Sequence, residues 1–419
     1  MPILARAFVL IVFAMALVGG GLVGVARRRV GRTYDVRPVS IERATAPEEI
    51  ERGGRLFRTN CLDCHAGAIA GTASADIAHT DRGPERRPIG GRVTGTPSFM
   101  GEIWAPNLTA DPETGIGAWT DGEIARLLRN GIGRERRYAA TMPRFARLAD
   151  ADIAALIGFL RSADPLVAPV RHSVPRPGLG VAGTLALAFA AGVDVRGEAH
   201  VPMPPRGRSA AYGRYLASAV YACVDCHTEG FTTTDDKLRS PVLLAGGQFH
   251  RTPNGETIYS TNLTSDPETG LTARTAAELE RLLTTGIKKN GAASRPPMPV
   301  FRFIDADEAQ ALFAYLGSVP AVVRKTPGAP PADRPTGNAP PEVLFATLGC
   351  PICHGDRAPH RALLVQASVR PALEIAAAIR NPEARHPGSQ MPTYASVLDE
   401  PTALRLANWI RATGGNPGR

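Results

Sequence analysis

Apolar positions recur at helical spacing near the end of three successive stretches of the chain. In each stretch, two large apolar residues follow a first one by three and four positions, which places all three on one helix face. The sets are Leu156, Phe159 and Leu160, then Leu312, Tyr315 and Leu316, and last Leu406, Trp409 and Ile410. A further helix is expected to open each stretch, in EEIERGGRLFRT, SAAYGRYLASAVYA and PEVLFATL. The pattern predicts a mainly α-helical chain of three modules, each opened and closed by a helix.

The first two modules are copies of each other. NLTADPETG begins at Asn107 and NLTSDPETG at Asn262, 155 residues further on. Thr-x-x-Glu pairs follow at the same offset and predict capping boxes at the start of a helix. The helices EIARLLRNG and ELERLLTTG then end at glycines suited to a left-handed C-cap. These positions are Thr120, Glu123 and Gly131 in the first copy, and Thr275, Glu278 and Gly286 in the second.

The shared DPETG stretch has two interpretations. Its acidic residues suit calcium, but they are fewer than that ion needs. Asp-Pro and Thr-Gly are turn chemistry, so we expect a turn.

Proline-rich segments separate the modules. Residues 164–206 contain several prolines, and the second linker begins PAVVRKTPGAPPADRPTG, which is typical of a semi-rigid, extended spacer. The predicted layout is an apolar segment at 1–30, modules at 45–163, 207–319 and 340–419, and linkers at 164–206 and 320–339.

All six cysteines lie in three Cys-x-x-Cys-His motifs. Two thiols at this spacing reach the two vinyl groups of one haem, and the next histidine sits under the iron as its proximal ligand. Three motifs that use every cysteine exclude a chance match and predict three covalently bound haem c groups. The motif residues are Cys61, Cys64 and His65, then Cys223, Cys226 and His227, and last Cys350, Cys353 and His354.

Other uses of Cys-x-x-Cys fit this pattern poorly. Zinc sites pair such motifs or add a distant histidine pair, whereas here the motifs are odd in number and far apart. A thioredoxin-like redox pair needs one motif and no histidine directly after it.

The sixth iron ligand is expected to be methionine. A thioether in that place raises the reduction potential of a haem that already has a histidine ligand. Three methionines each follow one motif, precede a proline and stand ahead of a short loop and an apolar helix. They are Met142, Met298 and Met391.

The remaining candidates are weaker. Met100 lacks the helix downstream and is interpreted as a packed loop residue. Met203 precedes the second motif and is interpreted as linker. Among the other histidines, His250 is the candidate for an alternative ligand.

The net charge is +9, from 48 basic and 39 acidic residues. Such a balance suits nucleic acid, an anionic membrane or an acidic partner. No run of five basic residues and no basic-aromatic interleaving is present, which argues against nucleic acid.

Residues 7–26 are 20 uncharged, mostly apolar positions, enough to cross a bilayer. Because GVA at 24–26 could serve as a cleavage site, a retained anchor and a cleaved signal peptide both stay open. The arginines at 27–29 favour a cytoplasmic side by the positive-inside rule. Covalent haem is attached outside the bacterial inner membrane, however, so we expect the modules in the periplasm. Residues 178–193 are too few to span and predict a buried helix, a membrane-surface contact or a partner contact.

The motifs NCLDCH, CVDCH and CPICH, the PNLTxDPETG type of stretch and the Met-Pro loops resemble the multihaem cytochrome c subunits of bacterial membrane-bound dehydrogenases. The resemblance covers about residues 45–320, and the third module resembles class I cytochrome c in general. It implies three class I cytochrome c domains in a membrane-attached, periplasm-facing electron conduit. The implied electron donor is a catalytic subunit of quinoprotein, flavoprotein or molybdenum type, and the implied acceptor is ubiquinone or another cytochrome.

Three functions compete on this basis. The first is an electron-transfer subunit of a dehydrogenase, which is not itself an enzyme. The second is a stand-alone anchored cytochrome that shuttles electrons between a reductase and a terminal oxidase. The third, a peroxidase-like enzyme, needs an open iron position, which His/Met ligation does not leave.

Overall fold

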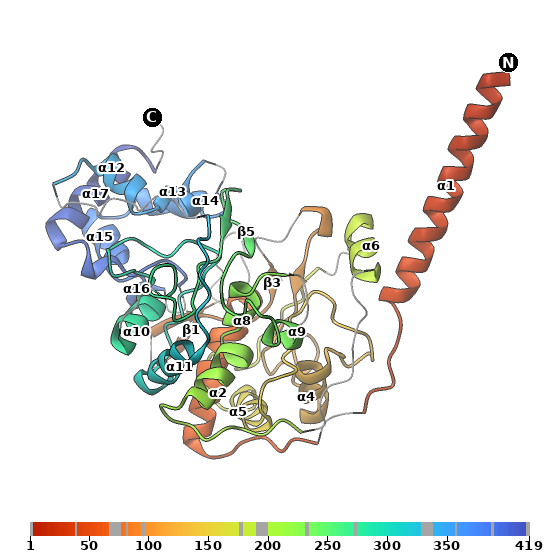
Figure 1. Ribbon diagram of the computed structural model, residues 1–419, viewed down its shortest axis with the longest axis horizontal. Helices are drawn as coiled ribbons and strands as arrows, with labels where there is room; N and C mark the ends of the chain where they lie inside the picture. The colour runs from red at the N-terminus through yellow and green to blue at the C-terminus, as the bar shows by residue number, and fades with distance from the viewer. Residues whose placement is uncertain are drawn as a thin grey trace. The chain divides into compact units, whose positions relative to one another are not determined.

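The computed structural model shows a mostly helical protein with a few short strands (Figure 1). It describes residues 3–37, 40–66, 77–80, 83–93, 98–175, 179–189, 200–230, 234–271, 275–327, 338–356, 358–386 and 389–415. The described strands pair into small antiparallel sheets, β1 (Ile77–Thr80) with β2 (Gly83–Arg86), β3 (Gly91–Arg92) with β4 (Trp104–Ala105), and β5 (Phe249–Arg251) with β6 (Thr257–Tyr259). The predicted mainly α-helical class is confirmed.

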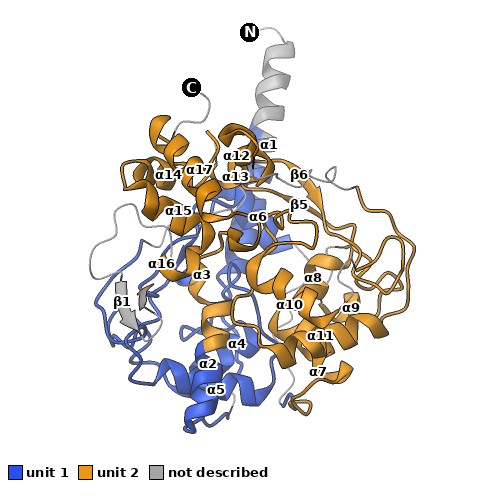
Figure 2. Cartoon of the chain, turned by 90° about the vertical axis from the view of Figure 1, so that its left-hand side faces the viewer, with its two compact units in different colours: residues 1–54, 64–76, 87–202 blue, residues 55–63, 77–86, 203–419 orange. Residues whose placement is uncertain are grey.

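The chain divides into two compact units, which Figure 2 colours separately. Unit 1 holds residues 1–54, 64–76 and 87–202, and unit 2 holds residues 55–63, 77–86 and 203–419. The division falls inside α2 (Pro47–Asn60) and inside the short α3 (Leu62–His65). Both units therefore contain part of the first Cys-x-x-Cys-His motif.

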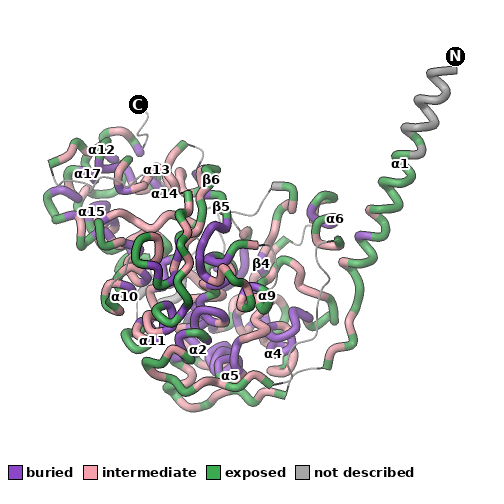
Figure 3. The backbone as a smooth tube through the Cα atoms, in the orientation of Figure 1, coloured by how far each residue is buried: buried purple, intermediate pink, exposed green. Residues whose placement is uncertain are grey.

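Unit 1 contains α1 (Ile3–Val30), the first half of α2, the 3₁₀ turn η2 (Ser98–Met100), α4 (Asp121–Asn130), α5 (Asp150–Leu160) and α6 (Val181–Phe189). The described part of α1 is largely exposed, whereas α2, α4 and α5 contain buried stretches (Figure 3). None of the helices within the described ranges combines the length and the apolar character that a membrane crossing requires.

Helix α6 forms most of the described part, residues 179–189, of the apolar stretch at 178–193. It packs against α1 and η2, and the Arg29 guanidinium lies 4.9 Å from the centre of the Phe189 ring. Val181 and Phe189 are nevertheless 54% and 46% exposed. The segment is thus a surface helix in this unit rather than a buried one, and residues 178 and 190–193 lie outside the described part of the chain.

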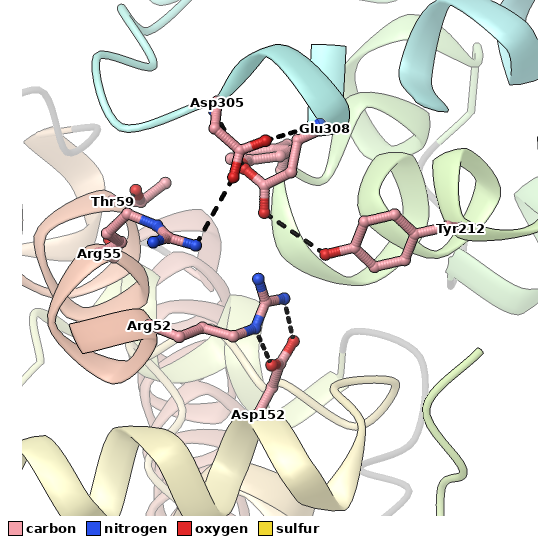
Figure 4. A network of polar contacts seen from close by, with 8 residues as sticks. Arg52, Arg55, Thr59, Asp152, Tyr212, Asp305 and Glu308 are labelled. Carbon is pink, nitrogen blue, oxygen red and sulfur yellow. Dashed lines mark hydrogen bonds and ion pairs between the residues drawn. The ribbon is translucent and has the colours of Figure 1, made fainter. Parts of the chain in front are cut away.

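The core of unit 1 lies where α2 meets α5. Gly53 lets the two backbones approach, because a Cβ at this position would lie 1.9 Å from the Ala155 carbonyl oxygen. Beside it, the Arg52 and Asp152 side chains form an ion pair with 4% and 0% of their surface exposed (Figure 4). Their Nη2 and Oδ2 atoms are 2.9 Å apart. Loss of either partner would leave a buried charge without compensation.

Unit 2 contains the following helices in chain order. They are α7 (Ala210–Tyr215), the π-helical turn η3 (Leu216–Val220), α8 (Cys223–His227), α9 (Thr234–Leu238), α10 (Ala276–Thr285), α11 (Ala306–Ser318), α12 (Pro341–Thr347), α13 (Cys350–His354), α14 (Arg361–Ser368), α15 (Ala372–Arg380), α16 (Pro382–Arg385), the 3₁₀ turn η4 (Tyr394–Ser396) and α17 (Glu400–Ala412).

Helices α7 and α11 repeat the contact between α2 and α5. A Cβ at Gly213 would lie 1.9 Å from the Ala311 carbonyl oxygen, as at Gly53. Tyrosines replace the buried ion pair. The Glu308 carboxylate accepts a hydrogen bond from the Tyr212 hydroxyl at 3.5 Å (Figure 4). It accepts a second one from the Tyr221 hydroxyl at 2.6 Å. The glycine contact is therefore common to both copies, while the polar contact beside it differs.

The C-terminal part of unit 2 packs around one buried cluster. Leu344 of α12 and Leu406 of α17 are fully buried in it, and Ile287 joins it from the loop after α10. The Phe345 and Trp409 rings lie 5.4 Å apart at the contact between the opening and closing helices. The opening and closing helices of the third module thus meet through two aromatic rings.

The helices predicted to open and close the modules are confirmed, as α2, α7 and α12, and as α5, α11 and α17. The capping box of Thr120 and Glu123 is present, and Gly131 ends α4 with a φ of 71°. In the second copy, Thr275 Oγ1 accepts from the Glu278 N–H and Gly286 has a φ of 72°. The π-helical turn between α7 and the second motif was not predicted, since its sequence, LASAV, reads as ordinary helix.

The glycine contact in the second copy has a measurable effect on stability. In Gly213→Ala, the added methyl meets backbone that cannot give way, so we expect a loss of about 1–3 kcal/mol in the free energy of unfolding. Gly317→Ala in α11 is the matched control, because a Cβ there meets no described atom within 4 Å. That change is expected to be neutral or to stabilise by up to about 1 kcal/mol. Urea unfolding of the haem-loaded chain compares them, and equal midpoints for the two variants would contradict this expectation.

Candidate haem-binding sites

The three Cys-x-x-Cys-His motifs stand in equivalent places. Each ends on a short helix, α3, α8 or α13, that follows directly on the opening helix or its last turn. Burial raises the pKa of the Cys223 and Cys350 thiols to about 12. The structure therefore presents each motif on a defined helical turn beside the core of its module.

Each motif histidine is held through its Nδ1 atom. His65 Nδ1 lies 2.8 Å from the Pro106 carbonyl oxygen, and His227 Nδ1 lies 2.8 Å from that of Thr261. A carbonyl oxygen can only accept, so Nδ1 carries the hydrogen and Nε2 keeps its lone pair. Metal-bound histidines typically make this bond, which orients the ring and raises its basicity toward the metal.

The imidazoles also sit in an environment that keeps them neutral. His65 and His227 are 7% and 8% exposed. Burial lowers the pKa of His65, His227 and His354, while the hydrogen bond to the carbonyl partly opposes this effect. A neutral imidazole is the form that binds a metal ion, so the electrostatics fit a proximal ligand.

The loop with the repeated NLT sequence positions the carbonyl that accepts the hydrogen bond of His65 or His227. Pro106 and Thr261 directly precede Asn107 and Asn262 in the two copies. The Asn107 amide donates to the Val170 carbonyl at 2.8 Å, and the Asn262 amide donates to that of Val322 at 2.7 Å. The beginning of each predicted linker is thus bonded to the loop whose carbonyl holds the motif histidine.

The DPETG stretch forms a turn, as predicted. The Asp111 carboxylate accepts from the backbone N–H and the hydroxyl of Thr114, both at 2.7 Å. Asp266 and Thr269 make the same two bonds at 2.6 Å in the second copy. The carboxylate therefore serves as an internal acceptor that closes the turn.

A glycine opposite each of the first two motifs adds a second bond. The N–H of Gly90 donates to the His65 carbonyl at 2.8 Å, and that of Gly246 donates to the His227 carbonyl at 2.7 Å. Both glycines have a positive φ, 89° and 71°. The sequence analysis did not predict these two glycines or the carbonyls of Pro106 and Thr261. The repeated N-L-T that follows Pro106 and Thr261 is the signal that could have identified the carbonyls.

The third module holds its histidine by a shorter route. His354 Nδ1 donates to the His360 carbonyl at 3.0 Å, and the His360 N–H donates to the Cys353 carbonyl at 3.0 Å. A local turn six residues long therefore replaces the NLT loop of the other modules.

The predicted methionine ligands occupy matching loops. Met142 and Met298 are half-buried, and the phenylalanine three residues after each donates its N–H to the helix before the loop at 2.8 Å, Phe145 to Leu128 and Phe301 to Leu283. Met391 is also half-buried, and it packs with Cys350 against the same buried cluster. The third module thus brings a predicted attachment residue and its predicted axial ligand to one core.

The alternative candidates lie elsewhere in their modules. The Met100 carbonyl accepts from the Gly180 N–H at 3.2 Å beside α6, and Met203 is half-buried in the segment before α7. His250 lies on β5, close enough to His227 for its charge to lower the pKa of that histidine. Its Nε2 is buried and has no hydrogen-bond partner among the described residues. A buried histidine nitrogen without a hydrogen-bond partner near the second motif suits a site that holds a further polar group. The cysteines and histidine of each motif are the residues that covalent haem requires.

The cytochrome c family matches residues 50–164, which include the first motif and Met142. This part of the chain is a cytochrome c domain. Domains of this family bind haem c covalently, so the first site fits its expected cofactor.

Curated relatives extend the match beyond this domain. A nicotinate dehydrogenase subunit of Pseudomonas putida is 29% identical over 261 residues, which are 60% of this chain and 21% of the relative. The fructose dehydrogenase cytochrome subunit of Gluconobacter japonicus is 26% identical over 269 residues, 61% of this chain and 52% of the relative. The cytochrome c subunit of the quinone alcohol dehydrogenase of Gluconacetobacter polyoxogenes is 37% identical over 105 residues, 25% of this chain and 20% of the relative.

The resemblance to cytochrome c subunits of dehydrogenases is therefore confirmed. The names of the fructose and alcohol dehydrogenase relatives denote cytochrome subunits, in keeping with the expected non-catalytic role. The chain spans about a fifth to a half of the length of these three relatives.

Replacing the methionines tests the ligand assignment. Met142→Ala, Met298→Ala and Met391→Ala should each open one iron, so that the ferrous chain binds one carbon monoxide where the wild type binds none. Met100→Ala and Met203→Ala are the matched controls and should leave binding unchanged. Carbon monoxide titration followed in the Soret band makes the measurement. A control variant that binds carbon monoxide, or a wild-type chain that does, would contradict the assignment.

The Asp111 turn should make stability depend on pH. Hydrogen bonds from Thr114 lower the pKa of Asp111, whereas the unfolded carboxyl keeps a pKa of about 3.9. The stabilisation is therefore complete above the ordinary pKa and is lost as the pH falls through the lowered one. We expect Asp111→Asn to be less stable than wild type at neutral pH, with a difference that shrinks in acid. Unfolding curves at several pH values measure it, with Asp35→Asn as an exposed control, and a difference that grows in acid would contradict the prediction.

Proposed function

We propose that the chain is a trihaem c-type cytochrome that transfers single electrons for a membrane-bound dehydrogenase. The observation that carries this proposal is the triple occurrence of one arrangement. In each module, a histidine directly after a Cys-x-x-Cys pair donates its Nδ1 hydrogen to a backbone carbonyl, at 2.8, 2.8 and 3.0 Å. Each haem, when bound, takes up and releases one electron at its iron.

The residues of the chain have separate roles in this function. The cysteines Cys61, Cys64, Cys223, Cys226, Cys350 and Cys353 provide the thioether links. His65, His227 and His354 present Nε2 as proximal ligand, in a ring that the Nδ1 bond prevents from turning. Met142, Met298 and Met391 would provide the second protein ligand of each haem and would leave no place for a small molecule at the iron. With side chains as both ligands, the chain would carry electrons without binding a substrate at the metal.

The partners follow from the relatives. Their names include nicotinate, fructose and alcohol dehydrogenases, so the proposed electron donor is the catalytic subunit of such an enzyme, of quinoprotein, flavoprotein or molybdenum type. The proposed acceptor is ubiquinone or another cytochrome. The supporting observation is the resemblance of residues 45–320 to dehydrogenase cytochromes.

The proposed location is the periplasmic side of the bacterial inner membrane. Covalent haem attachment takes place there, and the N-terminal segment is uncharged from residue 7 to residue 26. This segment is proposed to act as an anchor, or as a signal peptide if it is removed. Edman sequencing of the protein from native membranes decides between the two outcomes.

Purification from native membranes in mild detergent tests the function. We expect a stable complex with a dehydrogenase catalytic subunit, and we expect that subunit's substrate to reduce the haems of the complex. The control is the separated cytochrome, which the same substrate should not reduce. A chain that copurifies with an oxidase, or alone with three haems, would favour a stand-alone carrier. Peroxide turnover by the isolated chain would instead point to the enzyme that the proposal excludes.

A further inference from the structure

Two methionine loops meet inside unit 2. The loop at residues 298–303 contains Met298, and the loop at residues 389–393 contains Met391. The Val300 N–H donates to the Gln390 side-chain oxygen at 2.9 Å, on one side of Met391. The Thr393 N–H donates to the Thr285 carbonyl at 2.8 Å, on the other side. The methionine loop of the third module is thus bonded to the second module at both of its ends.

Arg302 makes most of the bonds at this junction. Its Nε donates to the Ser389 carbonyl at 2.7 Å, its Nη1 donates to Thr393 Oγ1 at 2.8 Å, and its Nη2 donates to the carbonyl of Met391 itself. A guanidinium presents its donors in a rigid planar fork, so three bonds to one loop fix the position of that loop. The side chain is 7% exposed, and little water competes for these acceptors.

The charge of Arg302 is compensated at the same place. Glu383 of α16 lies 3.1 Å from Nε, and its side chain is 28% exposed. Burial lowers the pKa of Arg302 and Glu383 raises it, but a guanidinium stays charged under both influences. Its hydrogen bonds are therefore charge-assisted and stronger than those of a neutral donor.

On its other face, the loop at residues 389–393 packs against the rest of the third module. Met391 packs on the buried cluster that also contacts Cys350. A small cavity at the junction is lined by Arg302 and Gln390, with Arg58 and Thr59 from the end of α2. If the bonds from Arg302 were removed, the loop would keep its apolar contact with the cluster but lose the bonds that fix its position.

The first module shows that this arginine is not needed to form a methionine loop. Met142 matches Met298, and the bonds of Phe145 and Phe301 to the preceding helix are the same. The residue four positions after Met142 is Ala146, where the second module has Arg302. The arginine is therefore specific to the module that contacts a second methionine loop.

We propose that Arg302 is a positioning residue that holds Met391 as the sixth ligand of the third haem from within the second module. The inference rests on the proposed function, because it assumes that Met391 is that ligand. It adds that the ligation of the third haem depends on a contact with the second module. The second and third modules would then act as one electron-transfer pair, in which separation of the modules opens the third iron.

Arg302→Gln is the variant that tests this inference. It removes the charge and the fork, so the loop should loosen and Met391 should leave the iron. We expect three covalent haems to remain, the methionine-to-iron charge-transfer band of the ferric chain to lose about a third of its intensity, and carbon monoxide binding to rise from none to one per chain. We also expect the reduction potential of the third haem to fall, since a methionine ligand raises it.

Three comparisons make the result specific. Arg208→Gln removes an exposed arginine that pairs with Asp307 and should behave as wild type. Arg302→Lys keeps a buried cation with hydrogen-bond donors and should restore part of the band. Adding Cys350→Ser and Cys353→Ser to Arg302→Gln removes the third haem and should abolish the new carbon monoxide binding.

The outcomes separate this inference from the proposed function. An Arg302→Gln chain that keeps the full band and binds no carbon monoxide would overturn the inference alone. Carbon monoxide binding that persists without the third haem would also overturn it, since the effect would then lie at another iron. A wild-type chain that already binds carbon monoxide at the third haem would overturn the proposed ligation and the inference with it.

Discussion

A hydrogen bond from histidine Nδ1 to a backbone carbonyl is the interaction on which the rest of this structure depends. It leaves the lone pair on Nε2, which the proposed haem iron requires, and it fixes the orientation of the ring. In the first two modules, the carbonyl belongs to Pro106 and Thr261, which lie 41 and 34 residues after the histidine. The third provides it from His360, six residues away. The same chemical requirement is therefore met by two different local folds.

The surrounding elements can be understood as supports for that bond. The NLT loop ties the carbonyl to the start of the following linker, through Asn107 and Val170 or Asn262 and Val322. The opening and closing helices meet at Gly53 or Gly213, where any side chain would strike the facing backbone. In the third module, the opening and closing helices meet through the rings of Phe345 and Trp409. Corresponding elements therefore have the same role in each module, although the residues that fill this role differ.

Much of this could be predicted from the sequence, because the signals were local. Cys-x-x-Cys-His, the Thr120–Glu123 cap, the Gly131 and Gly286 ends and the apolar helix faces all lie within a few residues of each other. The partner carbonyls, the docking of the linkers and the contacts of Arg302 could not be predicted in this way. They join positions that are far apart in the chain. Their acceptors are backbone carbonyls, which every residue has, so no residue type marks them in the sequence. The pairing of the second and third methionine loops is of this kind, since Arg302 and Met391 are 89 residues apart.

The most direct test of the proposed function is a redox titration of the full-length chain, purified with its haems, in the presence and absence of carbon monoxide. We expect three covalently bound haems per chain, three one-electron steps, and midpoint potentials that carbon monoxide does not shift. Fewer than three haems in fully assembled protein, or one step that carbon monoxide displaces in the wild type, would contradict the claim that this is an electron carrier with three closed irons.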